Sequence, residues 1–447
     1  MSEKSRSSFS GRIGFVLAAA GSAVGMGNLW RFPYLAAKYG GGIFLLVYVI
    51  LAVTFGFALM ITEISIGRKT GKSPLHAYES IDKRFKFLGV AASAVPMIIF
   101  PYYCVIGGWV IKYFEIYLTG DAHAAADDEY FGQFISGTGE PIICLAVFLF
   151  ITSLVVMFGV EKGIERVSKV MMPMLVLLAL GIAIYSLTLE GAMDGLVYYI
   201  KPDFSKFSIK TIIAAMGQLF YSMSLAMGIM ITYGSYMRRE DDLESSVRNI
   251  EIFDTGIAFL AGMMIIPSVF VFSGGSSETL QQGPTLMFVM LPKVFDSMPG
   301  SNIFGFVFFV LVLFAALTSA ISLMETIVSI FMETFHAKRI PVSIAVMAAA
   351  FLFALPSTLG YGVWSEVTIF GYQILDFFDF ISNNIAMPVV ALITSIFVGY
   401  VAKSQVVIDE VEHSGRFKAK KLYVFLIKYV VPICMAVILI SSLLGIV

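Results

Sequence analysis

Residues 20–33 read "AGSAVGMGNLWRFP" and hold polar side chains where the first membrane-spanning helix is expected. Small residues four apart, such as Gly21 and Gly25, are common where membrane helices pack closely. Close packing does not account for Asn28 and Arg31, because an amide or a guanidinium at membrane depth is unfavourable unless it faces a cavity or a partner. Irregular backbone is tolerated at that depth only where it lines such a cavity. The stretch therefore predicts a broken helix beside a polar site.

A second stretch, "GQLFYSMSLAMG" at residues 217–228, repeats this pattern five spans later with Gln218, Ser222 and Ser224. Interruptions at matching positions of two halves are typical of inverted-repeat transporters with a site at the membrane midplane. A broken helix exposes carbonyl groups that suit a cation and amide groups that suit a carboxylate. The two stretches together fit a site for a small zwitterion and Na⁺.

Two adjacent hydroxyls, Thr318 and Ser319, lie in "AALTSAIS" at residues 315–322. Hydroxyl oxygens are hard ligands that suit a cation beside the first broken helix. Hydroxyls in helices also commonly bond back to the preceding turn. Both interpretations stay open from the sequence.

The composition places the chain in a membrane. Of its 447 residues, 58% are hydrophobic and 14% charged, against about 45–50% and about 25% in soluble domains. Continuous apolar runs exclude a transmembrane barrel and predict an all-α protein. Three cysteines in apolar runs indicate no disulfide framework, and the net charge of −1 indicates no nucleic-acid partner. Eleven spans are expected, near 13–37, 42–66, 88–118, 141–159, 170–189, 210–236, 250–272, 303–332, 341–358, 370–401 and 423–446.

The basic residues predict the orientation. With the N-terminus in the cytoplasm, 22 of the 30 Lys and Arg fall in cytoplasmic segments. Eleven spans then place the C-terminus outside, in a multi-pass protein of the cell (inner or plasma) membrane. Outside, the apolar stretch within 273–302 is expected either to fold back over the protein as a short helix or to form a surface loop.

With these motifs assembled, the chain resembles the neurotransmitter:sodium symporter family, in its eleven-span bacterial branch. The resemblance covers about residues 9–400 and is carried most specifically by "GSAVGMGNLWRFPY". It implies a first repeat of five spans in 1–200, an inverted second repeat in 201–402, and a cytoplasmic loop with the eleventh span in 403–447.

The resemblance also implies three sets of binding residues. The first Na⁺ site would use Ala23, Asn28, Ser222 and Asp254. The second Na⁺ site would use the carbonyls of Gly21, Val24 and Ala315 with the hydroxyls of Thr318 and Ser319. The substrate pocket would comprise Ala23, Gly25, Met26, Gly27, Ile99, Tyr103, Tyr221, Ser222, Ser224, Met227, Ser319 and Leu323.

Two gates complete what the resemblance implies. The outer gate would pair Arg31 with Asp379, and the inner gate would pair Arg6 with Glu333 beside Phe9 and Tyr236. The chain departs from the family pattern with Phe9 for tryptophan, Tyr221 for phenylalanine and Ala226 for glycine.

Chloride is not expected as a co-ion. Animal members of the family generally need Cl⁻. Here Asp254 stands where an asparagine Na⁺ ligand is usual, and Ala258 stands where the chloride-binding serine or its acidic substitute would be. An ionised Asp254 would supply the negative charge of the site.

The expected function is Na⁺-coupled uptake of a neutral, hydrophobic or aromatic L-amino acid by alternating access, with no obligate protein partner. An alternative is Na⁺-coupled transport of another small zwitterion or amine. A channel would have a continuous polar stripe on several spans, whereas polar groups here gather at one depth. An intramembrane enzyme would need a nucleophile–base pair or a metal cluster, and the four histidines lie outside the spans.

Overall fold

The protein is built of helices, as its apolar runs predict. The computed structural model describes residues 8–272 and 283–445, and within them it contains no strand, only two isolated bridges. Among these described residues, nine helical stretches are long and apolar enough to cross a membrane: Gly42–Thr70, Lys83–Thr119, Gly139–Met157, Val160–Ser186, Leu243–Phe272, Ser301–Phe335, Arg339–Leu359, Ile374–Val401 and Lys420–Leu443. The all-α membrane class is therefore confirmed.

These stretches contain one α-helix each or two consecutive α-helices. They are α4 (Gly42–Leu51), α5 (Phe57–Thr70), α7 (Lys86–Thr119), α10 (Gly139–Met157), α11 (Arg166–Ser186), α15 (Leu243–Phe272), α17 (Ser301–Phe335), α18 (Arg339–Leu359), α19 (Ile374–Asp379), α20 (Met387–Ile396), α22 (Lys420–Phe425) and α23 (Val431–Leu443). Shorter helices lie in the connections: α6 (Pro74–Ile81), α8 (Ala122–Ala125), α9 (Tyr130–Ser136), α12 (Ala192–Ile200), α16 (Leu291–Asp296) and α21 (Gln405–Glu412).

The first expected span is broken. It consists of α1 (Arg12–Ala23), α2 (Met26–Leu29) and α3 (Arg31–Lys38), and the chain bends by 60° between α1 and the α2–α3 segment. The helix stops because Val24 adopts an extended conformation with ψ 96°. Counted as one span, this bent pair raises the number of candidate spans in the described residues from nine to ten.

The expected span over 210–236 is also broken, into α13 (Ile209–Ser222) and α14 (Ile229–Gly234). Neither piece is long enough to cross a membrane alone. Between them, Ser224, Ala226 and Gly228 have φ values of 52°, 60° and 71°. The left-handed region is unfavourable for residues with a Cβ, so the surrounding structure must hold this linker. One such contact is the Ala226 amide, which donates to the buried Glu63 Oε1 at 2.7 Å.

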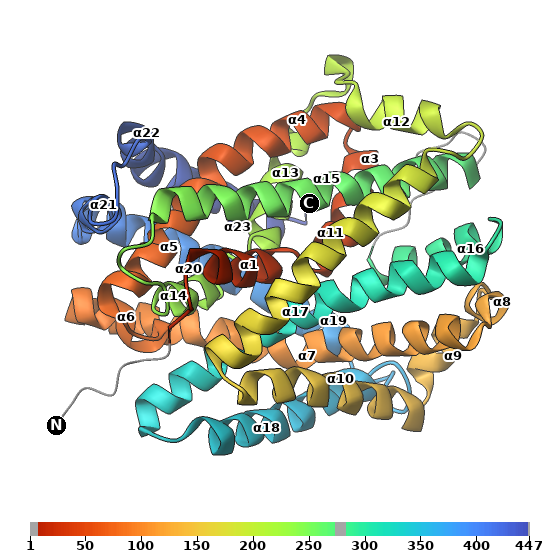
Figure 1. Ribbon diagram of the computed structural model, residues 1–447, viewed down its shortest axis with the longest axis horizontal. Helices are drawn as coiled ribbons and strands as arrows, with labels where there is room; N and C mark the ends of the chain where they lie inside the picture. The colour runs from red at the N-terminus through yellow and green to blue at the C-terminus, as the bar shows by residue number, and fades with distance from the viewer. Residues whose placement is uncertain (1–7, 273–282, 446–447) are drawn as a thin grey trace.

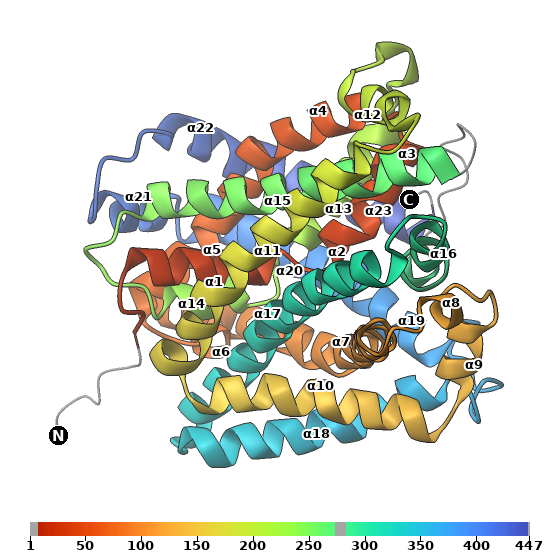
Figure 2. The ribbon, with the colours of Figure 1, turned by 45° about the vertical axis from the view of Figure 1, so that its right-hand side comes forward.

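The broken spans occupy the middle of the bundle. Figure 1 shows α1 and α14 between α15 and α4 on one side and α7, α17, α10 and α18 on the other. After the 45° turn of Figure 2, α2 and α13 also lie in this central layer. The outer helices present apolar side chains to their surroundings, for example Leu177 on α11 and Phe353 on α18. This arrangement surrounds the irregular backbone with protein, as a membrane requires.

The apolar part of 273–302 folds back over the protein as a short helix. Residues 273–282 lie outside the described residues, but Leu286–Met290 and α16 are helical, and Leu286, Met287 and Phe288 are buried. Tyr113 Oη donates to the Phe288 carbonyl at 2.6 Å. The expected division into 1–200, 201–402 and 403–447 stays a prediction.

Close packing of α5 against α14 fixes the inner half of the second broken span. A Cβ at Gly67 would collide with the Ile231 carbonyl oxygen, and a Cβ at Gly234 would collide with the Ile64 carbonyl oxygen. We expect Gly67→Ala to lower the free energy of unfolding by about 1–3 kcal/mol, because backbone atoms must move. Thermal unfolding in detergent, followed by intrinsic fluorescence, measures this.

Gly256→Ala on α15 is the matched control, since a Cβ there meets nothing within 4 Å. Alanine favours helix over glycine, so this variant should melt at or above the wild-type temperature. Equal melting temperatures for Gly67→Ala and wild type would show that α5 and α14 do not need this contact.

Candidate functional site

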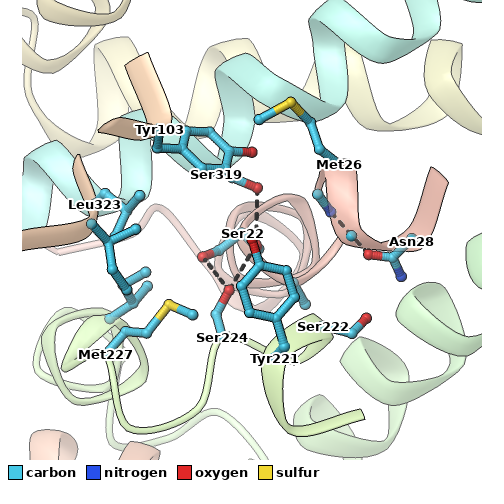
Figure 3. Close-up of a pocket in the computed structure, with 15 residues that line it drawn as sticks. Ser22, Met26, Asn28, Tyr103, Tyr221, Ser222, Ser224, Met227, Ser319 and Leu323 are labelled. Atoms are coloured by element: carbon cyan, nitrogen blue, oxygen red, sulfur yellow. Dashed lines mark hydrogen bonds between the residues drawn. The ribbon is translucent and has the colours of Figure 1, made fainter. Parts of the chain in front are cut away.

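A cavity lies where the two broken spans face each other. Figure 3 shows side chains from both breaks, from α7 and from α17 around it. Fifteen residues line it: Ser22, Ala23, Gly25, Met26, Gly27, Asn28, Ile99, Tyr103, Tyr221, Ser222, Ser224, Met227, Ile229, Ser319 and Leu323. All twelve residues expected in the substrate pocket are among them. Asn28, expected at a Na⁺ site, also reaches it, and Ser22 and Ile229 are additions.

The end of α1 forms a polar floor in this cavity. The Ser22 carbonyl accepts hydrogen bonds from Ser224 Oγ at 2.9 Å and from Ser319 Oγ at 3.1 Å. Because α1 ends at Ala23, this carbonyl is outside the helical ladder. It therefore joins the first break, the second break and α17 at one point (Figure 3).

The opposite wall presents a hydroxyl without a partner. Tyr103 Oη is buried and has no hydrogen-bond partner among the described residues. A Cβ built on Gly25 would lie 3.6 Å from Tyr103 Oη and 2.9 Å from Ser319 Oγ. Glycine at position 25 therefore allows the backbone to approach these hydroxyls. The Tyr103 hydroxyl, buried without a partner among the described residues, is available to hydrogen-bond a ligand.

Asp254 of α15 lies at the first break and is fully buried. Its Oδ1 accepts hydrogen bonds from Asn28 Nδ2 at 2.8 Å and Ser222 Oγ at 2.7 Å, and its Oδ2 accepts one from Tyr48 Oη at 3.3 Å. No ion pair of the described residues includes Asp254. A carboxylate buried among neutral donors is unfavourable without a counter-charge, so this position suits a cation. Residues Asn28, Ser222 and Asp254 are thus brought together as expected for the first Na⁺ site.

Residues expected at the second Na⁺ site lie where α1 meets α17. A Cβ on Gly21 would be 3.2 Å from the Thr318 Cβ. Thr318 Oγ1 donates to the carbonyls of Phe314 at 2.9 Å and Ala315 at 3.1 Å. Thr318 is therefore bonded to its own preceding turn, as the alternative interpretation of the sequence allowed. Val24 begins the extended segment after α1, which frees carbonyls there from the helical ladder.

The outer-gate residues are not joined as an ion pair. Arg31 lies with its guanidinium carbon 5.5 Å from the centre of the Tyr221 ring. Asp379 Oδ1 accepts a hydrogen bond from Asn383 Nδ2 at 2.7 Å. Within the described residues no ion pair links Arg31 and Asp379. The aromatic ring of Tyr221 thus separates the arginine from the cavity.

At the end of the bundle near Phe9, Arg6 lies outside the described residues. Phe9 is buried, and its amide donates to the Tyr236 carbonyl at 3.1 Å. Glu333 Oε2 accepts a hydrogen bond from the Ser73 amide at 2.7 Å. These contacts place three of the four inner-gate residues without describing the expected Arg6–Glu333 pair.

A second cluster at this end was missed by the sequence reasoning. Glu325 of α17 is buried, accepts a hydrogen bond from Tyr236 Oη at 2.7 Å, and is paired with Arg339 at the start of α18, with Nη2 to Oε1 2.9 Å. The sequence indication of this cluster was Glu325, a single acidic residue in the otherwise uncharged run "SLMETIVS". Glu63 and Tyr48 could have been noticed in the same way, because each is a polar side chain within an apolar span.

A protein-family model described as the sodium:neurotransmitter symporter family matches residues 6–130 and 126–446. The chain belongs to this family. It is therefore a multi-pass membrane transporter and not an enzyme, as the broken helices and the resemblance led us to expect.

Three similar proteins support this assignment. The sodium-dependent transporter YhdH of Bacillus subtilis is 36% identical, with 99% of this chain and 98% of the relative covered. A sodium-dependent transporter of Haemophilus influenzae is 34% identical, with 98% of this chain and 99% of the relative covered. The crystal structure of MhsT in complex with L-phenylalanine superimposes with a TM-score of 0.87 and 37% identity, over 98% of this chain and 100% of that one.

Ser319 and Thr318 lie where α17 meets the end of α1, whereas Thr326 lies eight residues after Thr318 on the same helix. We expect Ser319→Ala and Thr318→Ala each to weaken the stabilisation by Na⁺, raising the Na⁺ concentration at half effect about ten-fold, because a hard oxygen ligand is lost. Thermal unfolding titrated with NaCl against KCl measures this. Thr326→Ala is the matched control, since Thr326 Oγ1 is buried and bonds to the Ser322 carbonyl at 2.9 Å. An unchanged Na⁺ titration in both Ser319→Ala and Thr318→Ala would remove α17 from the ion site.

Proposed function

We propose that the protein is a Na⁺-coupled symporter that takes up a neutral, hydrophobic or aromatic L-amino acid by alternating access, without chloride. The observation that carries this proposal is one cavity lined by both broken spans, in which two lining residues, Asn28 and Ser222, hydrogen-bond to the buried carboxylate of Asp254. The alternative, another small zwitterion or amine as substrate, shares this site and differs in what occupies its apolar end.

The cavity walls favour an uncharged side chain. No Lys, Arg, Asp or Glu is among the fifteen residues that line it. Tyr103 Oη and the backbone at Gly25 and Gly27 would receive the substrate carboxylate. Ile99, Met227 and Leu323 would contact the substrate side chain, as apolar walls usually do in ligand sites. The complex of the similar protein MhsT with L-phenylalanine supports this substrate class.

The oxygen atoms at the first break fit Na⁺. Asp254, Ser222, Asn28 and the Ala23 carbonyl offer carboxylate, hydroxyl, amide and carbonyl oxygens, the ligands that hard cations prefer. Asn28 Oδ1 accepts a hydrogen bond from the Gly25 amide at 3.1 Å, and its second lone pair is left for the ion. The second Na⁺ would lie among Gly21, Val24, Ala315, Thr318 and Ser319.

The charge of the occupied site argues against a need for chloride. At the first Na⁺ site, Na⁺ and the substrate ammonium bring two positive charges and the substrate carboxylate brings one negative charge; the second Na⁺ would lie further off and is left out of this sum. With a neutral residue at 254 the sum would be +1, which is unfavourable at low dielectric. The carboxylate of Asp254 makes the sum zero without another anion.

Alternating access would use the contacts at both ends. Arg31, Tyr221 and Asp379 would close the outer side, and Arg6, Phe9, Tyr236 and Glu333 the inner side. Exposed ion pairs are worth only about 0–1 kcal/mol, which suits contacts that must break in every cycle. The basic residues favour a cytoplasmic N-terminus, an outside C-terminus and insertion in the cell membrane.

Uptake into proteoliposomes tests the proposal. With an inward Na⁺ gradient and chloride replaced by gluconate, labelled L-phenylalanine should accumulate saturably, and replacing Na⁺ by K⁺ should abolish accumulation. Competition by each of the twenty amino acids then defines the substrate. Uptake that rises linearly with concentration and ignores Na⁺ would instead indicate a passive pore.

Met227 tests the apolar end of the pocket. Methionine is unbranched and adapts to different partners, so Met227→Phe should shift preference from aromatic towards smaller aliphatic substrates, with competition by tryptophan weakened about ten-fold relative to leucine. Met227→Leu conserves volume and should leave the ratio within about two-fold. Unchanged competition by tryptophan and leucine in Met227→Phe would show that this side chain does not contact substrate.

Asp254 tests the charge argument. Asp254→Asn and Asp254→Ser should transport slowly in chloride-free buffer and recover at least several-fold when chloride is added, because the missing negative charge is then supplied by the anion. Glu251→Gln, one turn away on the same helix, is the matched control and should stay independent of chloride. Full activity of Asp254→Ser without chloride would contradict the assignment.

A further inference from the structure

An ordered segment projects sideways from the bundle between α12 and α13. In Figure 1 it stands out at the top, beyond α4 and across the direction of α7 and α17, and it lies at the end of the bundle away from α21 and α22. All ten residues 201–210 are exposed. In the proposed orientation this end faces outward, so the segment points along the outer surface of the membrane.

The segment is held in place despite its exposure. Asp203 accepts hydrogen bonds from the Ser205 amide at 3.0 Å and Ser205 Oγ at 2.6 Å, and Ser208 Oγ caps α13 by accepting from the Thr211 amide at 3.2 Å. Pro202 forms a bridge with Gly41 in the turn between α3 and α4. The exposed side chains therefore belong to a defined surface.

Three large apolar side chains on this surface have no cover. Phe204 is 70% exposed, Phe207 49% and Ile209 71%. Apolar groups gathered on one exposed surface indicate contact with another molecule or with a membrane. Because the segment extends sideways from membrane-spanning helices, the lipid bilayer is the apolar environment that these side chains can reach.

Lysines accompany these apolar groups. A groove beside the segment is lined by Gly40, Val197, Tyr198, Lys201, Pro202, Asp203, Phe204 and Lys206. Lys206 Nζ lies 4.7 Å from the centre of the Tyr198 ring. Lys210 follows, and residues 201–210 carry three lysines and one aspartate, a formal charge of +2.

Half of the Lys and Arg residues that fall outside the expected cytoplasmic segments lie in or near this segment. The 30 Lys and Arg less the 22 assigned to cytoplasmic segments leave eight, and Lys38, Lys201, Lys206 and Lys210 are four of them. Hydrogen bonds from Ser205 hold the pKa of Asp203 below its usual range, so the Asp203 carboxylate already has its hydrogen-bond partners within the loop. The groove thus offers ammonium groups to an anion from outside the chain.

We propose that residues 201–210 form a lipid anchor that binds an anionic phospholipid. Phe204, Phe207 and Ile209 enter the acyl-chain region, and Lys201 and Lys206 bind the headgroup phosphate in the groove. Lysine stems extend along apolar surface while their ammonium groups stay at headgroup level, and lysines close to a membrane attract anionic lipids. The combination selects lipid over a free anion, because the apolar side chains contact the tails.

The anchor touches the outer half of the first broken span. Tyr198 Oη donates to the Ala37 carbonyl of α3 at 2.6 Å. Gly40 and Gly41 have φ of 97° and 59°, and a Cβ on Gly40 would lie 3.0 Å from the Lys206 Cβ. A bound lipid would therefore contact the segment that packs on the α3–α4 turn, close to the end of the helix that carries Arg31.

Local fluorescence quenching tests the anchor on the full chain in nanodiscs and needs no transport, so it is independent of the proposed function. Phe204→Trp places a reporter on the segment, and the wild-type signal, from the three native tryptophans, is subtracted. Brominated phosphatidylglycerol or brominated phosphatidylcholine is mixed at equal mole fraction into unlabelled phosphatidylcholine. We expect both to quench the reporter, with a relative binding constant about ten-fold in favour of phosphatidylglycerol.

Two variants on the Phe204→Trp background separate charge from fold. Lys201→Gln with Lys206→Gln should bring the preference close to one, whereas Lys201→Arg with Lys206→Arg should retain it. Equal quenching by the two lipids with both lysines intact would overturn the headgroup site. No quenching by either lipid, or quenching that disappears as protein per nanodisc rises from one copy to two, would overturn the anchor and indicate exposure to water or a second copy of the chain.

Discussion

A carboxylate buried among neutral donors is the constraint on which the rest of the site depends. Asp254 has Asn28, Ser222 and Tyr48 within hydrogen-bond distance and no basic partner among the described residues. Such a group is stable as an anion only when a cation joins it. In a transporter, that cation can be cargo. In the proposed function Na⁺ balances the charge of Asp254, and a zwitterionic substrate adds no net charge to the site.

The broken helices follow from the same requirement. A continuous helix uses its own carbonyl groups and offers none to a ligand at membrane depth. Ending α1 at Ala23 frees the Ser22 carbonyl to receive Ser224 and Ser319. The left-handed linker after α13 is unfavourable by itself, and the contact of Glu63 with the Ala226 amide holds it. Long helices such as α7 and α17 then exclude water around this polar centre.

Much of this arrangement was predictable because membrane depth makes polar residues conspicuous. Asn28 and Ser222 stood out within apolar runs, and every residue expected in the substrate pocket lines the cavity. Three features were not predictable. The positive φ values of Ser224 and Ala226 depend on contacts from α5, distant in sequence. Tyr48, Glu63 and Glu325 were visible as polar groups, but their partners come from other spans, and no sequence pattern reports the distance between spans. The gap between the Arg31 and Asp379 side chains depends on which conformation the chain adopts, which no motif reports.

Equilibrium binding by the wild-type protein tests the central claim most directly. Labelled L-phenylalanine is titrated in detergent, by scintillation proximity, in sodium gluconate, in potassium gluconate and in sodium chloride. We expect saturable binding that is equal in the two sodium salts and absent in potassium, because Na⁺ and Asp254 supply the charges of the occupied site. Binding that is unaffected by replacing Na⁺ with K⁺, or that appears only with chloride, would contradict it.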